Sequence, residues 1–188
     1  MVDIKELPDE ELALEACEDK ECFGVLINRY EDKLSRYIRR ITSYNNDDVA
    51  DILQNTFMKA YVNLNSFNPE LKFSSWIYRI THNESISFHR SKKLKPTISI
   101  EEEDLADTLI SDTDIESEYL DNEERQNILE SIHRLPDKYK DVIVLKFLEH
   151  KDYTEISDIL KIPEGTVATR INRAKSKLKE IRSKNKNE

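Results

Sequence analysis

Apolar residues recur every three or four positions along most of this chain, and this spacing limits it to helical folds more than any other property. Steps of three and four place the apolar residues of each stretch on one face of an α-helix. No repeated strand-like alternation is present, and the 188 residues include only two glycines and five prolines. The sequence therefore predicts an all-α protein. The first apolar stripe is formed by Phe23, Leu26, Ile27, Tyr30, Leu34, Tyr37, Ile38 and Ile41.

The apolar stripes fall into two groups. Stripes within 23–41, 49–64 and 73–89 predict three helices that close a small core, and residues 8–20 suggest a short preceding helix. The pattern fails from about Lys92 to Ser117, where Pro96 disfavours a helix and an acidic run begins. We expect two small helical domains, 1–93 and 128–188, joined by an acidic flexible linker over 94–127. The second stripe places Val49, Ile52, Leu53, Phe57, Ala60, Tyr61 and Leu64 inward.

The net charge of −9 argues at first against a nucleic-acid partner. Its distribution changes that conclusion. Residues 1–95 carry a net charge of −2, residues 96–130 carry −12, and residues 131–188 carry +5. The C-terminal part is therefore basic, and its charge is compatible with DNA binding.

Two features predict a cytoplasmic protein without membrane insertion. The longest aliphatic run, 142–145, is far shorter than the roughly 20 residues that span a bilayer. The N-terminus has neither the basic start nor the apolar stretch of a signal peptide.

The sequence lacks the motifs of an enzyme or a cofactor site. No Gly-rich phosphate loop or nucleophile elbow is visible, and the acidic cluster lies in the expected linker, which could not fix acid–base geometry. Cys17 and Cys22 do not have a zinc-site spacing and are expected to be small, reduced, apolar residues, with a redox role as the alternative. The spacing of His82 and His89 would permit a shared metal ion but does not by itself indicate one. We therefore expect no catalytic residue, metal or cofactor.

Residues 153–181 have the order of a helix-turn-helix: a short helix, a turn with Pro163 and Gly165, and an amphipathic helix. In this motif the second helix enters the major groove of DNA. Arginine pairs with guanine and asparagine with adenine, while lysines reach phosphates. The alternative is a charged, solvated helix that only caps a bundle. The DNA-binding candidates are Thr166, Ala168, Thr169, Arg170, Asn172, Arg173, Ser176 and Lys177, flanked by Lys175 and Lys179.

Two blocks of the sequence together resemble one family. The segments 135–139, 153–156 and 162–174 resemble the fourth conserved region of extracytoplasmic-function (ECF) sigma factors. Residues 48–90 resemble the second region of the same family through Asp51-Ile52-Leu53-Gln54, Phe57, Ala60-Tyr61, Ser66-Phe67 and the run 73–80. Many regulators share a helix-turn-helix, but both blocks joined by an acidic linker are specific. The resemblance implies an alternative sigma factor that binds core RNA polymerase and directs promoter-specific initiation at −35 and −10 elements.

The resemblance also implies roles for the first domain and a partner. A surface on the second predicted helix would bind core polymerase, and an anti-sigma factor, soluble or membrane-anchored, is an expected partner. The −10 residues would melt the promoter and capture an extruded base, although Trp76 has the helical spacing of a core residue. The polymerase-binding candidates are Asp48, Asp51, Gln54, Asn55 and Met58. The −10 candidates are Asn65, Ser66, Asn68, Lys72, Trp76, Arg79, His82, Asn83 and Arg90, with His89 and Lys92 as further phosphate contacts.

The chain departs from the family pattern at several positions. Val49-Ala50-Asp51 and Gln54-Asn55 stand where the polymerase-binding helix usually carries two more carboxylates, and Ala168 stands where the recognition helix is usually basic. A consensus −35 sequence is therefore not expected. Two alternatives stay open: a sigma-like decoy that binds an anti-sigma protein, and a stand-alone helix-turn-helix regulator.

Overall fold

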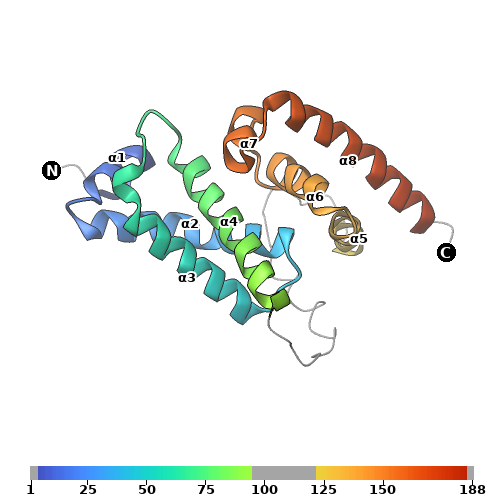
Figure 1. The fold of residues 1–188 in the computed structure, drawn as a ribbon, viewed down its shortest axis with the longest axis horizontal. Coiled ribbons are helices and arrows are strands. Elements are labelled where there is room, and N and C mark those ends of the chain that lie inside the picture. Colours follow the sequence, from blue (N-terminus) through green and yellow to red (C-terminus); the bar gives the residue numbers. More distant parts are fainter. Residues whose placement is uncertain (1–3, 95–121, 186–188) are drawn as a thin grey trace.

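A computed structural model describes residues 4–94 and 122–185 (Figure 1). Within these ranges the chain is helical and contains no strand, so the all-α prediction is confirmed. Most of the linker expected at 94–127 lies outside the described residues. The N-terminal elements are η1 (Ile4–Glu6), α1 (Asp9–Glu15), α2 (Lys20–Ile41), α3 (Asn46–Val62), η2 (Leu64–Ser66) and α4 (Phe73–Leu94). The C-terminal elements are α5 (Asn122–His133), α6 (Asp137–Ile143), the π-helical segment η6 (Val144–Leu148), α7 (Tyr153–Leu160) and α8 (Glu164–Asn185).

Two N-terminal helices, α2 and α3, follow a residue whose side chain accepts a hydrogen bond from a free amide of the first turn. Asp19 accepts a hydrogen bond from the Glu21 amide at 2.9 Å, and Asn45 accepts one from the Asp48 amide at 2.8 Å. The helices then bury their apolar faces around the fully enclosed Tyr37 and Phe73. This core fixes α4, which carries most of the −10 candidates, against α2 and α3.

The C-terminal domain packs α6, η6, α7 and α8 around an aliphatic core. Val142, Leu145, Ile156, Ile159 and Ile171 are all at most 1% exposed. α5 begins six residues before the domain start that the sequence predicted at 128.

The two domains are in contact. α7 lies against α4, as Figure 1 shows near the centre of the molecule, and α6 and η6 also touch α2. Most buried apolar residues of both domains form one continuous cluster, and Ile38, Val49 and Ile52 form a second, smaller one. The sequence left the relative placement of the two domains open, so this packing is a finding of the structure.

Candidate nucleic-acid interface

Local hydrogen bonds hold both ends of α7, the helix that precedes the turn to α8. Asp152 accepts a hydrogen bond from the Glu155 amide at 2.7 Å, and the Glu155 carboxylate accepts one from the Asp152 amide at 2.9 Å, which completes a capping box. α7 ends at Lys161 in the left-handed conformation, with φ of 52°. The Ser157 hydroxyl then donates to the Ile162 carbonyl oxygen at 2.6 Å. These bonds set the direction in which α8 leaves the turn.

We expect Asp152→Ala to lower the free energy of unfolding of the chain by about 1 kcal/mol, because it removes the acceptor for the Glu155 amide. Urea denaturation followed by circular dichroism measures this change. Asp158→Ala is the matched control, since Asp158 lies in the same helix and pairs only with Lys161 at 3.3 Å. An equal loss in both variants would show that the cap contributes nothing specific.

α8 presents the predicted recognition face to solvent. Val167, Ile171 and Ala174 are buried on the opposite side, as the apolar spacing predicted. The −35 candidates therefore share one accessible surface of the helix. Thr169, Asn172, Arg173 and Ser176 are exposed, and Thr166, Ala168, Arg170 and Lys177 are half-buried at its edge.

Two lysines beside this face rest on aromatic rings of the same domain. The Lys175 ammonium lies 5.1 Å from the centre of the Phe147 ring, and the Lys177 ammonium lies 6.0 Å from that of Tyr139. Such cation–π contacts restrict flexible side chains while leaving the charge available. The flank of α8 is therefore positively charged, as phosphate binding requires.

The structure divides the −10 candidates into exposed and buried residues. The loop residues and Lys72 lie at the surface, together with two residues of α4, whereas Arg79 is half-buried. Trp76 and His82 are only 8% and 7% exposed. The exposed members are Asn65, Ser66, Asn68, Lys72, Asn83 and Arg90.

Trp76 is part of an aromatic cluster inside the N-terminal domain. Its ring centre lies 5.5 Å from that of Phe67 and 5.6 Å from that of Phe73. These are the separations of packed aromatic pairs. The indole thus occupies the core position that its helical spacing favoured, and it does not offer a free face for base stacking in this conformation.

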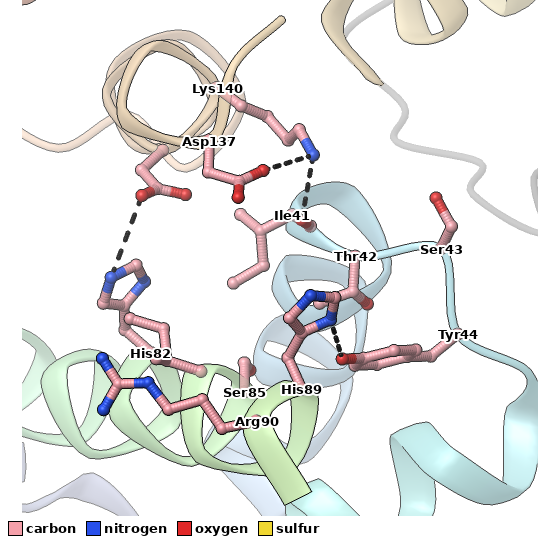
Figure 2. Close-up of a pocket in the computed structure, with 12 residues that line it drawn as sticks. Ile41, Thr42, Ser43, Tyr44, His82, Ser85, His89, Arg90, Asp137 and Lys140 are labelled. Carbon is pink, nitrogen blue, oxygen red and sulfur yellow. Dashed lines mark hydrogen bonds and ion pairs between the residues drawn. The ribbon is translucent and has the colours of Figure 1, made fainter. Parts of the chain in front are cut away.

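His82 is buried where the two domains meet, and Figure 2 shows its ring pointing from α4 toward α6. Its Nδ1 lies 3.1 Å from the Tyr37 hydroxyl, and its Nε2 lies 3.9 Å from the Asp141 carboxylate. Burial lowers the pKa of His82 to about 4. Burial, with the nearby Asp137 charge, raises the pKa of Asp141 to about 7. A phosphate contact from His82 would require the C-terminal domain to move away.

A cavity of about 540 Å³ lies next to this pair. Residues of both domains line it, including His89, Arg90 and Lys140 (Figure 2). This space is partly open to solvent, so it is a cleft between the domains and not an enclosed void. The domains therefore leave a solvent-accessible cleft beside His82 and Asp141, although one apolar cluster runs through both domains.

The polymerase-binding candidates lie on one side of α3. Asp51, Gln54, Asn55 and Met58 are exposed, and the half-buried Asp48 pairs with Lys92. An apolar patch that the sequence analysis missed extends this surface, in which Met58 is 59% exposed, Tyr61 49% and Val62 76%. The expectation that Tyr61 points inward was wrong, because the residue is half exposed although its ring centre lies 5.1 Å from that of Phe23. Exposed apolar groups in such a row mark binding surfaces.

The described residues contain no cluster of three or more histidine, cysteine or carboxylate side chains that could hold a metal ion. His89 contacts Tyr44 at 2.9 Å, whereas His82 contacts Tyr37, so the two rings have separate partners.

Cys17 and Cys22 are both free thiols. Among the helices of the described ranges, none has the length and hydropathy of a membrane span.

Comparisons with known proteins match both domains and most of the chain. The family model for Sigma-70 region 2 matches residues 26–94, and that for Sigma-70 region 4 matches residues 125–178. The fold is similar to that of CnrH in its complex with the cytosolic domain of CnrY, with a TM-score of 0.69 and 23% identity over 93% of this chain and 97% of CnrH. It is also similar to RpoE of Bartonella quintana in complex with the anti-sigma factor NepR, with a TM-score of 0.64 and 20% identity over 86% and 96% of the two chains.

Curated relatives cover the same length. The ECF RNA polymerase sigma factor SigW of Bacillus subtilis is 36% identical over 86% of this chain and 89% of its own. The ECF RNA polymerase sigma-E factor of Haemophilus influenzae is 35% identical over 84% and 85%. Both domains, in the order and over the length of these relatives, are present here. The chain therefore belongs to the family of ECF RNA polymerase sigma factors, which direct transcription initiation and are not enzymes.

Proposed function

We propose that this chain binds core RNA polymerase and reads the −35 element of its promoters through Thr169, Asn172 and Arg173. The observation that carries the proposal is the exposed polar face of α8. Val167, Ile171 and Ala174 are buried on the opposite side of the helix and so keep this face toward solvent. Arginine and asparagine on the exposed side of a recognition helix suit bidentate contacts to guanine and adenine, and Asn172 and Arg173 lie in the first half of α8. The domains at 1–93 and 128–188 would act on different promoter elements, with the linker between them.

The first domain would supply the polymerase and −10 contacts. The exposed row on α3, extended by Met58, Tyr61 and Val62, supports a protein-binding surface there. The exposed loop residues Asn65, Ser66 and Asn68 carry short polar groups that could replace the lost pairing of an extruded base. The chain itself would have no catalytic residue or cofactor.

An anti-sigma protein is the proposed regulatory partner. Two structures with the same fold are complexes with CnrY and with the anti-sigma factor NepR. By analogy, this chain would act in the bacterial cytoplasm and could reach the membrane only through such a partner.

In vitro transcription with purified core polymerase on a pool of genomic promoters tests the function. We expect new discrete transcripts when the chain is added. Arg173→Ala and Asn172→Ala should each weaken them about tenfold or more, since one bidentate base contact contributes about 1–3 kcal/mol of discrimination. Lys20→Ala, which removes an exposed charge at the start of α2, is the control and should leave them unchanged.

Two other outcomes would point to the alternatives. A chain that forms no complex with core polymerase and yields no transcripts would contradict the proposal, and capture of an anti-sigma protein would then favour the decoy. Binding to duplex operators without polymerase would favour a stand-alone regulator. The family match over residues 26–94 argues against that last reading.

A further inference from the structure

A buried ion pair joins the two domains. Arg40 of α2 donates to the Glu149 carboxylate at 2.8 Å and to the Leu148 carbonyl oxygen at 3.0 Å. The hydroxyl of Tyr78, on α4, donates to the other Glu149 oxygen at 2.6 Å. The side chains of Arg40 and Glu149 are only 9% and 6% exposed. Glu149 of the C-terminal domain is therefore held by two groups of the N-terminal domain.

This pair is sensitive to the loss of either member. A buried charge is tolerated only when its partner and hydrogen bonds replace the water it has lost. If the domains separate, water can solvate both Arg40 and Glu149. If one partner is neutralised while the domains stay together, the other stays buried and loses its oppositely charged partner. A substitution at this pair therefore favours separation of the domains.

A second set of contacts pairs carboxylates of the C-terminal domain with one exposed and one buried residue predicted to bind −10 DNA. The Lys72 ammonium lies 3.3 Å from the Glu155 carboxylate and 3.7 Å from that of Asp152, and both belong to the cap of α7. His82 faces Asp141 of α6. Carboxylates of the C-terminal domain thus stand beside −10 candidates that were expected to meet phosphates.

The contact between the domains leaves the −35 candidates exposed to solvent. Thr169, Asn172 and Arg173 remain exposed on α8 while Lys72 and His82 face the other domain. The domain contact therefore covers part of one predicted DNA surface and leaves the other open.

We propose that the structure is a closed state in which the C-terminal domain masks two −10 candidates: it buries His82 of α4 and pairs its carboxylates with the exposed Lys72 of the preceding loop. The Arg40–Glu149–Tyr78 cluster holds this state, and it must open before the −10 strand is bound. The masking role rests on the proposed function, whereas the closed state rests on the domain contacts alone.

The distance between the domains tests the closed state in the full chain without polymerase or DNA. One dye is attached to the exposed Cys17 and a second to a thiol introduced by Ser183→Cys near the end of α8. Cys22 is buried, and burial raises the pKa of its thiol, so it reacts slowly. Energy transfer between the dyes then reports separation of the domains.

We expect Glu149→Gln to lower the ratio of closed to open molecules at least about tenfold, and energy transfer to fall accordingly. Tyr78→Phe, which removes one hydrogen bond, should produce a smaller fall in the same direction. Asp158→Asn removes a carboxylate that contacts only its own helix and should leave energy transfer unchanged. Unchanged energy transfer in a fully helical Glu149→Gln chain would overturn the closed state. If the Glu149→Gln chain loses helicity, the Tyr78→Phe chain is used instead, and unchanged energy transfer in that chain would overturn the closed state.

Binding of a fluorescein-labelled, random-sequence single-stranded DNA tests the masking. An open chain should bind this probe up to about tenfold more tightly than the wild type, because the closed fraction no longer competes. Equal affinity of the wild type and an opened Glu149→Gln would refute masking while leaving the closed state in place. Absence of promoter-specific transcripts would instead contradict the proposed function and leave the energy-transfer result intact.

Discussion

Trp76→Ala should lower the free energy of unfolding of the N-terminal domain by about 3–5 kcal/mol, the cost of emptying a packed aromatic site. The indole is 8% exposed and contacts the rings of Phe67 and Phe73, so its removal leaves a cavity beneath α4. Such a loss is a large part of the stability of a small domain. Urea denaturation followed by circular dichroism measures it.

Two further variants separate packing from DNA contact. Trp76→Phe keeps an aromatic ring and should lose clearly less stability than Trp76→Ala. Leu71→Ala removes a large apolar side chain that is 47% exposed nearby, and it should cost well under half as much. A Trp76→Ala chain of native stability that fails to open promoters would show instead that the indole acts as a stacking platform.

The sequence predicted those features of the fold that depend on local spacing. The stripe at 23–41 became α2, and the residues Val167, Ile171 and Ala174 became the buried side of α8. Helical periodicity determines which side of a helix is apolar, so it also predicted which residues of α8 face solvent. The sequence therefore indicated which side of α8 is accessible, whereas the contact of that side with a −35 element stays a prediction.

The contact between the domains could not be identified in this way. Arg40 and Glu149 are 109 positions apart, and in a chain with many charges neither residue is distinctive. His82 was assigned to DNA because it lies on the −10 helix, and nothing in the local sequence indicates that Asp141 is its neighbour. Tyr61 was placed inward by its spacing, but α3 lies at the edge of the domain and leaves it half exposed. Each of these outcomes depends on which helices pack against one another, and the spacing of apolar residues gives no information about that.

The His82–Asp141 pair should give opposite pH dependences when its members are removed one at a time. Asp141 has a pKa of about 7 in the folded chain against 3.8 unfolded, so the folded state binds the extra proton between these values. This contribution lowers the free energy of unfolding as the pH rises toward 7. His82 has a pKa of about 4 against 6.5, so the folded state binds fewer protons and the free energy of unfolding rises between pH 4 and 6.5. In the wild type the two contributions nearly cancel over that range.

We therefore expect the free energy of unfolding of Asp141→Asn, relative to the wild type, to increase by about 4 kcal/mol between pH 4 and pH 7. That of His82→Gln, relative to the wild type, should decrease by about 3 kcal/mol between pH 4 and 6.5. The difference in free energy of unfolding between a variant and the wild type at the same pH removes the contributions of all other titrating groups. Urea denaturation at several pH values measures these free energies. The double variant should follow the wild type, because the two changes offset each other. If both single variants ran parallel to the wild type, His82 and Asp141 would be solvated in the folded chain, and the domains would not be packed together at this pair.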